Sequence, residues 1–315
     1  MIIRKFVQLL LAAAATTLPP AARAQEAACG NIGETSCAQT EAQPLPDVES
    51  PSVHLWSASV SAGISTLDDG PDGSYQALSL TRSVGRGYVR AGFMRYHGTL
   101  LQADIALPSD YYVGTIATGG NFDNWVTDGW VSYGRQVYGD IDSSAGQRKS
   151  TGPTGSDYYA FGGDFGRIIT LAPNWYLTST VAGSYAHGKL LRPAPTGIEL
   201  LDLETDEPTW SGTATLRVDH AFGASRRHYI GLSLSRNWTS NAVSQLRFGP
   251  PVEDAGSLVP SSLYSKHYAD SWFEVGATAN MQLTNDLALD LYGTRRFSAL
   301  AGNIVSAGVS LRKSF

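Results

Sequence analysis

The chain has 315 residues, of which 43% are hydrophobic and 16% are charged, with 33 glycines and a formal net charge of −5. Its charged fraction lies well below the roughly 25% of an average soluble domain, and its acidic balance argues against nucleic acid as a partner. With 2 cysteines and 3 methionines it is neither a disulfide scaffold nor a methionine-rich binder. After residue 24, no apolar run approaches the ~18 residues that a membrane helix needs.

Residues 1–24 have the pattern of a secretory signal peptide. Arg4 and Lys5 precede an apolar run over 6–15, and a small-residue cleavage site ends at Ala24. Cleavage there removes three cations and no acid, so the net charge changes from −5 to −8. The mature chain is therefore predicted to leave the cytoplasm.

Residues 25–52 carry no periodic apolar pattern and contain Cys29, Cys37 and several prolines. In an oxidising compartment the two cysteines are able to close a short loop as a disulfide. We predict a periplasmic leader, irregular in structure, which is able to plug the lumen of the domain that follows.

From residue 53 to the end, apolar and polar residues alternate with a period of two, as they do in a strand with one greasy and one wet face. Between 273 and 283 every odd position is apolar, whereas the even positions carry Glu274, Gly276, Thr278, Asn280 and Gln282. The alternation predicts twelve strands, at roughly 53–65, 74–83, 86–97, within 99–118, 125–138, 157–170, 174–188, 208–222, 226–240, 268–283, 286–297 and 302–315. Because 99–118 contains two successive alternating runs, ten or fourteen strands remain open.

Three features favour a membrane barrel over a soluble sandwich. The wet face holds glycine and small polar residues, and the segments are longer than the usual strand of ~5–6 residues. Short connections such as 84–86 and 171–174 alternate with long polar ones at 139–156, 189–208 and 241–263, as in barrels with short periplasmic turns and long outer loops. Strand-end aromatics are expected to form the interfacial girdles: Trp56, Trp125, Trp175, Tyr176, Trp210, Trp238 and Trp272.

The predicted fold class is thus all-β. Residues 53–315 are expected to form a transmembrane, antiparallel, up-and-down β-barrel of about twelve strands in the bacterial outer membrane, with both termini in the periplasm. The expected surroundings are outer-membrane lipid and lipopolysaccharide. The C-terminal strand, ending on Phe315, is expected to be the signal for the barrel assembly machinery.

Charged residues on the wet face are the candidate site. The alternation points seven of them inward, where they would form either a selectivity constriction or a salt-bridge network: Asp164, Arg217, Asp219, Glu274, Asp290, Arg296 and Arg312. Arg95 and Arg236 fall on the apolar face, which places them near an interface or beside a bulge.

No HExxH, CxxC, phosphate loop or GxSxG motif is present, so we expect no catalytic, cofactor or metal site and no enzyme activity. The acidic residues of 189–208 are expected to form a solvated loop, because their spacing does not match a calcium loop.

Four stretches resemble the translocator barrel of bacterial autotransporters: 156–166 (SDYYAFGGDFG), 171–177 (LAPNWYL), 283–289 (LTNDLAL) and 306–315 (SAGVSLRKSF). The resemblance covers about 125–315 and implies a twelve-stranded barrel at the C-terminus of a secreted passenger. One departure is that only 28 residues, 25–52, separate the predicted cleavage site from the first strand.

The expected function is a narrow passive channel for small solutes, or an autotransporter-like translocator or anchor barrel without a large passenger. The alternative is a sealed structural barrel whose outer loops bind a partner or an envelope component. A hydrolase assembled from distant strands ranks third.

Overall fold

A computed structural model describes residues 55–68, 70–102, 105–194, 201–223, 228–248, 251–254, 257–260 and 263–315. The predicted signal peptide and leader, with Cys29 and Cys37, lie outside the described residues. Among the residues described, no helix is long and apolar enough to cross a membrane.

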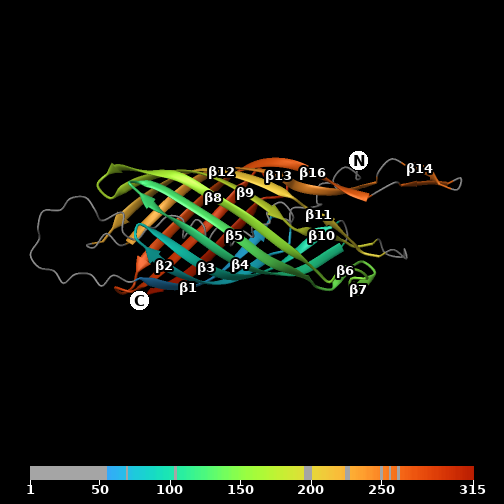
Figure 1. The fold of residues 1–315 in the computed structure, drawn as a ribbon, viewed down its shortest axis with the longest axis horizontal. Coiled ribbons are helices and arrows are strands. Elements are labelled where there is room, and N and C mark those ends of the chain that lie inside the picture. The colour runs from blue at the N-terminus through green and yellow to red at the C-terminus, as the bar shows by residue number, and fades with distance from the viewer. Residues whose placement is uncertain are drawn as a thin grey trace, which may run out of the picture.

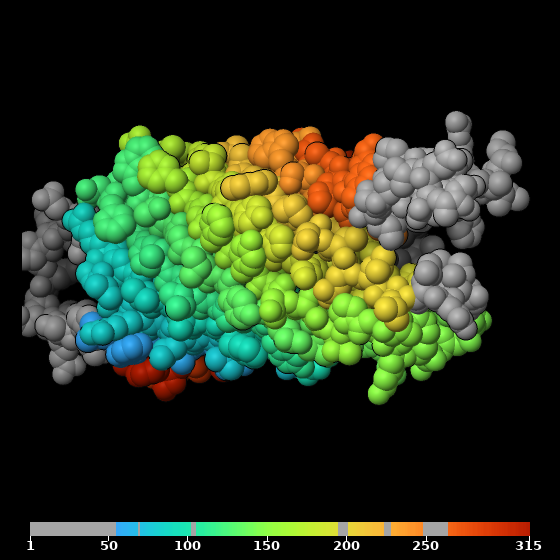
Figure 2. Space-filling model, turned by 45° about the vertical axis from the view of Figure 1, so that its right-hand side comes forward, coloured from blue at the N-terminus to red at the C-terminus, as the bar shows by residue number. Residues whose placement is uncertain are grey.

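Twelve long strands of the described residues form a closed antiparallel barrel (Figure 1). They are β1 (Trp56–Leu67), β2 (Gly73–Val84), β3 (Gly87–Gln102), β4 (Ile105–Phe122), β5 (Trp125–Tyr138), β8 (Gly155–Ala172), β9 (Trp175–His187), β12 (Thr209–Phe222), β13 (His228–Phe248), β16 (Leu263–Gln282), β17 (Leu287–Phe297) and β18 (Ile304–Ser314). Strand β1 pairs with both β2 and β18, which closes the wall. In Figure 2 the strands follow one another around the wall in chain order, until the red C-terminal strand lies beside the blue N-terminal one.

Small hairpins extend the connections at one end of the barrel, on the right in Figure 1. They are β6 (Ile141–Ser143) with β7 (Gly146–Arg148), β10 (Lys189–Arg192) with β11 (Leu203–Asp206), and β14 (Pro251–Asp254) with β15 (Ser257–Pro260). We call this end the loop end. The opposite end, where β2, β4, β8, β12 and β16 connect to the next strand, is the turn end.

The prediction of a twelve-stranded antiparallel barrel is confirmed, and ten or fourteen strands are excluded. The doubtful stretch resolves because the first alternating run, 101–107, spans the connection between two strands: β3 continues to Gln102, and β4 starts at Ile105 as its partner. The second run lies within β4. Alternation is kept on both sides of this connection because β3 and β4 pair as far as Gln102 and Ile105.

The barrel wall exposes apolar side chains on its outer face and buries polar side chains on its inner face, which is the reverse of a soluble protein. In β1, Val60 and Ile64 point outward with 67% and 60% of their surface exposed, whereas Ser61 and Ser65 point inward and are each 8% exposed. The same alternation gives β13 an outward apolar row. An apolar exterior around a polar interior suits a barrel whose solvent is lipid.

At the turn end the chain reverses in tight turns that need left-handed backbone. Asp123, Asn124 and Asn174 have φ values of 55°, 68° and 69°. These residue types tolerate that conformation better than other non-glycine residues, so the turns are locally encoded. The last residue also lies here: the Phe315 amide donates to the Trp56 carbonyl at 2.8 Å, and the Trp56 amide donates to the Phe315 carbonyl at 3.1 Å.

Aromatic side chains gather on the outer wall near both ends. Near the loop end, the Tyr185 ring lies 4.8 Å from that of Trp210, and at the turn end the Trp175 ring stacks on His220 at 4.4 Å. Two of the expected girdle members are wrong. Trp272 is 2% exposed and points into the lumen, and Tyr176 has inward parity because it pairs with Asp219, whereas its neighbour Trp175 points outward. A position at the end of a strand does not decide whether a side chain faces lipid or lumen. The alternation of side chains along the strand decides it.

Candidate functional site

Four of the seven charges predicted to face the lumen are brought together in pairs. Arg217, 5% exposed, lies 2.7 Å from the Asp219 carboxylate and donates to the Thr278 hydroxyl at 2.9 Å. Arg312 lies 3.8 Å from Asp290, which also accepts from the Asn280 amide. Opposite charges with further hydrogen bonds offset the cost of removing each from water.

The other three predicted charges have different neighbours. Arg296 is 4% exposed, and its guanidinium carbon lies 4.6 Å from the centre of the Trp272 ring. Glu274 is its cross-strand partner on β16. Asp164 stands opposite Asp128, a buried carboxylate that accepts a hydrogen bond from the Tyr88 hydroxyl. The structure therefore places these groups in separate contacts around the lumen.

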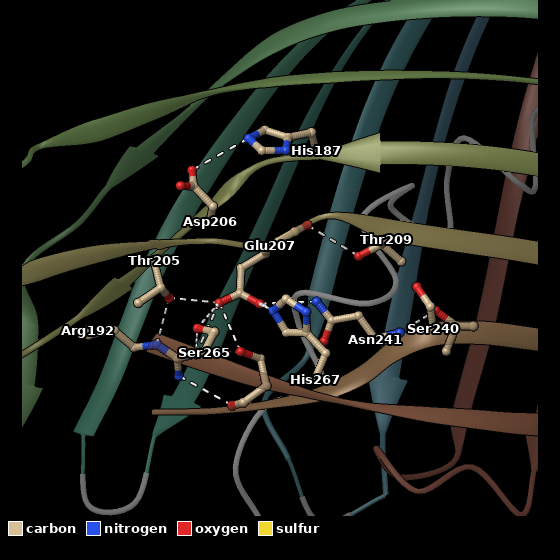
Figure 3. Close-up of polar contacts among 12 residues, drawn as sticks. His187, Arg192, Thr205, Asp206, Glu207, Thr209, Ser240, Asn241, Ser265 and His267 are labelled. Carbon is tan, nitrogen blue, oxygen red and sulfur yellow. Dashed lines mark hydrogen bonds and ion pairs between the residues drawn. The ribbon is translucent and has the colours of Figure 1, made fainter. Parts of the chain in front are cut away.

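A denser polar cluster, which sequence reasoning missed, lies at the loop end (Figure 3). Its centre is Glu207, which is 2% exposed and lies between β11 and β12. The Glu207 amide donates to the Gly188 carbonyl at 3.0 Å. Because Pro208 follows, Glu207 is also biased toward extended backbone, which carries the chain from the hairpin into the barrel wall.

Five hydrogen-bond donors and the His267 imidazole surround the Glu207 carboxylate. Its Oε1 lies 3.1 Å from Arg192 Nη2, 2.7 Å from Thr205 Oγ1, and 2.9 Å from the hydroxyls of both Ser244 and Ser265. Its Oε2 accepts from Asn241 Nδ2 at 3.1 Å and lies 3.0 Å from His267 Nε2. The donors come from β10, β11, β13 and β16, so this one carboxylate ties the β10–β11 hairpin to two strands of the wall.

A second carboxylate joins two of the long connections. Asp202 accepts from both terminal nitrogens of Arg148, each at 2.7 Å, and from the backbone amides of Ala194 at 2.7 Å and Thr151 at 2.8 Å. Burial opposes ionisation of Asp202, but the hydrogen bonds from Arg148, Ala194 and Thr151 outweigh it and hold the pKa of Asp202 well below its ordinary value. The Asp202 carboxylate therefore fastens β7, through Arg148, and the residues after β7, through Thr151, to the connection between β10 and β11.

These contacts correct the expectation that 189–208 is a solvated acidic loop. Asp202 and Glu207 are 3% and 2% exposed, because each is paired with an arginine and several neutral donors. Spacing along the sequence could not reveal them, since most of the donors lie on other elements.

Apolar side chains form a cluster at the same end. Leu107 of β4 and Leu191 of β10 are both 0% exposed. The cluster joins β3, β4, β5, β6, β10 and β13 through Leu100, Leu107, Tyr138, Ile141, Leu190, Leu191, Ala242 and Val243. Strands β4 and β13 are separated by four strands in one direction around the barrel and by six in the other, so they stand on nearly opposite walls. A cluster containing both links opposite walls through the β10–β11 hairpin.

Ser265 and His267 stand two residues apart, a Ser-x-His spacing that is visible in the sequence. In the structure both serine hydroxyls of the cluster, those of Ser244 and Ser265, donate to Glu207 rather than to the imidazole. A serine nucleophile needs its proton directed at the base, so this arrangement fastens strands instead of activating a serine. Within the part of the chain that the structure describes, no group of three or more His, Cys, Asp or Glu is placed to hold a metal ion.

A closed barrel with an apolar exterior and a polar lumen is the architecture of integral β-barrel proteins of the bacterial outer membrane. The family model "Autotransporter beta-domain" matches residues 108–294, which is more than half of the chain, so the chain belongs to this family. Autotransporter β-domains are barrels of the bacterial outer membrane.

Solved structures agree on the fold. The translocator domain of the autotransporter NalP from Neisseria meningitidis is 14% identical, with a TM-score of 0.60, over 82% of this chain and 88% of that one. The β domain of the Bordetella autotransporter BrkA is 15% identical, with a TM-score of 0.52, over 82% and 98%. An outer-membrane channel from Pseudomonas putida F1 is 11% identical, with a TM-score of 0.50, over 87% and 100%. No curated protein matches the sequence.

Proposed function

We propose that this protein is an autotransporter-type outer-membrane anchor barrel whose lumen is held closed at the loop end by the β10–β11 hairpin. The observation that carries the proposal is the apolar cluster that links β4 to β13, with Leu107 and Leu191 both 0% exposed. Packing this tight leaves little room for solutes, because protein interiors are filled to crystal-like density. A permanently open diffusion channel would not need it.

The proposed orientation places the turn end in the periplasm and the loop end outside the cell. It is supported by the contrast between tight turns such as Asp123–Asn124 and the hairpin-bearing connections at the other end. We test it with Gln147→Cys in a Cys29→Ser/Cys37→Ser background, because Gln147 is exposed at the loop end. A membrane-impermeant maleimide should label it in intact cells. Labelling only after the outer membrane is permeabilised would reverse the orientation.

Phe315 is proposed to be the signal that the barrel assembly machinery reads. Its ring is 57% exposed on the wall, while its backbone pairs with Trp56. Deleting Phe315 should lower the amount of barrel in the outer membrane without changing its synthesis, as measured by quantitative blotting of membrane fractions. Equal membrane levels would remove this role.

The closed lumen is tested by single-channel conductance of the refolded full chain in a planar bilayer. The intact protein should be nearly silent, whereas Leu190→Asp/Leu191→Asp should conduct steadily, because two carboxylates at buried positions of the cluster separate the hairpin from the wall. Leu201→Asp is the matched control, since Leu201 lies in the same connection and is 67% exposed. Steady conductance from the intact protein, equal to that of the double variant, would overturn the closed lumen and favour the small-solute channel.

A further inference from the structure

Arginines on the lipid-facing side of the wall at the loop end differ in whether a carboxylate accompanies them. Arg95 pairs with Asp110 at 3.1 Å, and Arg135 lies 3.6 Å from Asp157. Arg295 makes two hydrogen bonds to Asp68, at 2.9 and 2.6 Å. These three positive charges are neutralised by the protein itself.

Arg236 on β13 has no such partner among the residues that the structure describes. Its contacts are the Ser271 hydroxyl, to which its Nη2 donates at 2.6 Å, and the Phe273 ring, whose centre lies 4.4 Å from the guanidinium carbon. Phe273 is the cross-strand partner of Arg236, and Ser271 that of Trp238. The guanidinium is therefore held in place by two neutral neighbours while its charge stays unneutralised.

Arg236 lies at the edge of the row of outward-facing apolar residues on β13. Toward the turn end, Ile230, Leu232 and Leu234 point outward with 51%, 67% and 49% of their surface exposed; toward the loop end comes Trp238, at 45%. Each residue of a tilted strand advances about 2.5 Å along the membrane normal. Arg236 therefore lies about 10 Å along the normal from Leu232. It is the outward-facing residue next to Trp238, on the side nearer the centre of the membrane. That is the depth at which an arginine side chain reaches the lipid headgroups.

Headgroups at this depth carry phosphates, and a guanidinium presents paired donors that match phosphate geometry. The Ser271 hydroxyl accepts from one terminal nitrogen of the Arg236 guanidinium and the Phe273 ring covers one of its faces, and the described residues offer no carboxylate to its other donors. An isolated charge facing lipid costs free energy unless an anion accompanies it. Since no carboxylate of the described residues pairs with Arg236, the lipid is the source of the complementary anion that we consider.

We propose that Arg236, with Ser271 and Phe273, forms a binding site for a phosphate group of lipid A in the outer leaflet. The choice of lipid A rests on the orientation given under the proposed function, because the loop end then meets the leaflet that contains lipopolysaccharide. The exposed Phe273 ring, which contacts the guanidinium, and the exposed Trp238, two residues along β13, supply apolar surface for the adjoining acyl chains.

The test is native mass spectrometry of the detergent-solubilised full chain titrated with purified lipid A. Arg236→Ala should weaken lipid A binding about tenfold or more, which is the loss expected for charge-assisted hydrogen bonds. Arg236→Lys should retain part of the affinity, because a point charge remains but the planar fork is lost. Arg95→Ala is the matched control: it removes a loop-end arginine that already has Asp110 as its partner, and binding should change less than about twofold.

Two further ligands separate the sources of the phosphate. The natural protein should bind dephosphorylated lipid A only weakly. Its affinity for this ligand should be no higher than the affinity of Arg236→Ala for intact lipid A. Phosphatidylglycerol should bind more weakly than lipid A. Equal lipid A affinity in the natural protein and Arg236→Ala would overturn the site, and equal, Arg236-dependent binding of phosphatidylglycerol would overturn the assignment to lipid A. Labelling at Gln147→Cys reports the orientation separately, so a wrong orientation and a wrong site give different results.

Discussion

At the turn end, some hydrogen bonds close a single turn, as where the Asn124 amide donates to the Asn121 side chain at 3.0 Å, and others join neighbouring turns, as between Arg86 and Asp123. At the loop end they join distant parts of the chain: Arg192 reaches Ser265, Glu207 reaches Ser244, and Arg148 reaches Asp202. The loop-end carboxylates Glu207 and Asp202 are buried and accept from several donors, whereas turn-end pairs such as Arg86 with Asp123 are largely exposed. Removing one charge should therefore disturb the loop end far more than the turn end, because an uncompensated charge is costly only where water cannot reach it.

Glu207→Ala should have the largest effect. Arg192 is 6% exposed, and losing its partner leaves that charge buried, which costs about 3–5 kcal/mol. We expect amide hydrogen exchange in β10 and β11 to become faster by about a hundredfold or more, while the barrel strands keep their protection. Asp206→Ala is the control. Asp206 is the neighbour of Glu207 in the sequence, but its side chain is 67% exposed, so the substitution should change hydrogen exchange little. Equal effects of the two variants would contradict the central role of Glu207.

Leu191→Ala should come next. The side chain is 0% exposed in the apolar cluster, and such truncations cost about 2–5 kcal/mol. The hairpin should open more often, seen as brief conductance events in a planar bilayer that the intact protein lacks. The same truncation at Leu201, which is 67% exposed, should leave the record unchanged. Identical records for Leu191→Ala and the intact protein would argue that the cluster does not control the lumen.

The Asp202–Arg148 pair should give a smaller, pH-dependent effect. Because the folded pKa of Asp202 lies below its unfolded value of ~3.9, its stabilisation is present above that pH and is lost as the pH falls through it toward the folded pKa. Hydrogen exchange at Thr151, corrected for intrinsic rates, should accelerate across this range. In Asp202→Asn the dependence should disappear, with a loss at neutral pH of about 1.5–3 kcal/mol. A pH profile unaltered by this substitution would assign the protection to other contacts.

The turn-end pair of Asp286 and Lys313 should show the smallest effect. Hydrogen bonds from the Lys313 ammonium, 2.8 Å away, and from the Thr284 hydroxyl lower the pKa of Asp286 to about 2. The same sign rule applies: the contribution is present above the unfolded pKa and is lost as the pH falls toward 2. Because solvent and salt screen this exposed pair, Asp286→Asn should leave the urea midpoint of the barrel unchanged within error. A midpoint shift as large as that of Asp202→Asn would remove the contrast between the two ends.

Much of the barrel was readable from the sequence because its signal is local. Side chains alternate faces along a strand, so the period of two in 273–283 marked a strand that the structure places in β16. Turn residues such as Asn174 and the terminal Phe315 marked the turn end for the same reason. The same parity placed Arg217 and Asp219 on one face, which is why their proximity could be anticipated.

Alternation failed where a strand end or a turn intervened. Trp272 was assigned to a girdle because of its place near a strand end, yet it points inward below Arg296. The run 101–107 alternates across the connection between β3 and β4, which no count of apolar positions can detect.

What the sequence by itself determined is the wall: about twelve strands, the two faces of most of them, and the end at which the turns are short, while the structure fixed the number of strands at twelve. Only the tertiary structure decided how the loop end closes. The acidic residues of 189–208 look solvated along the chain, but Glu207 and Asp202 acquire partners from β10, β13, β16 and the segment after β6. The physical reason is range: strand periodicity depends on residues two apart, whereas the burial of a charge depends on donors supplied by distant segments that meet only when the barrel closes.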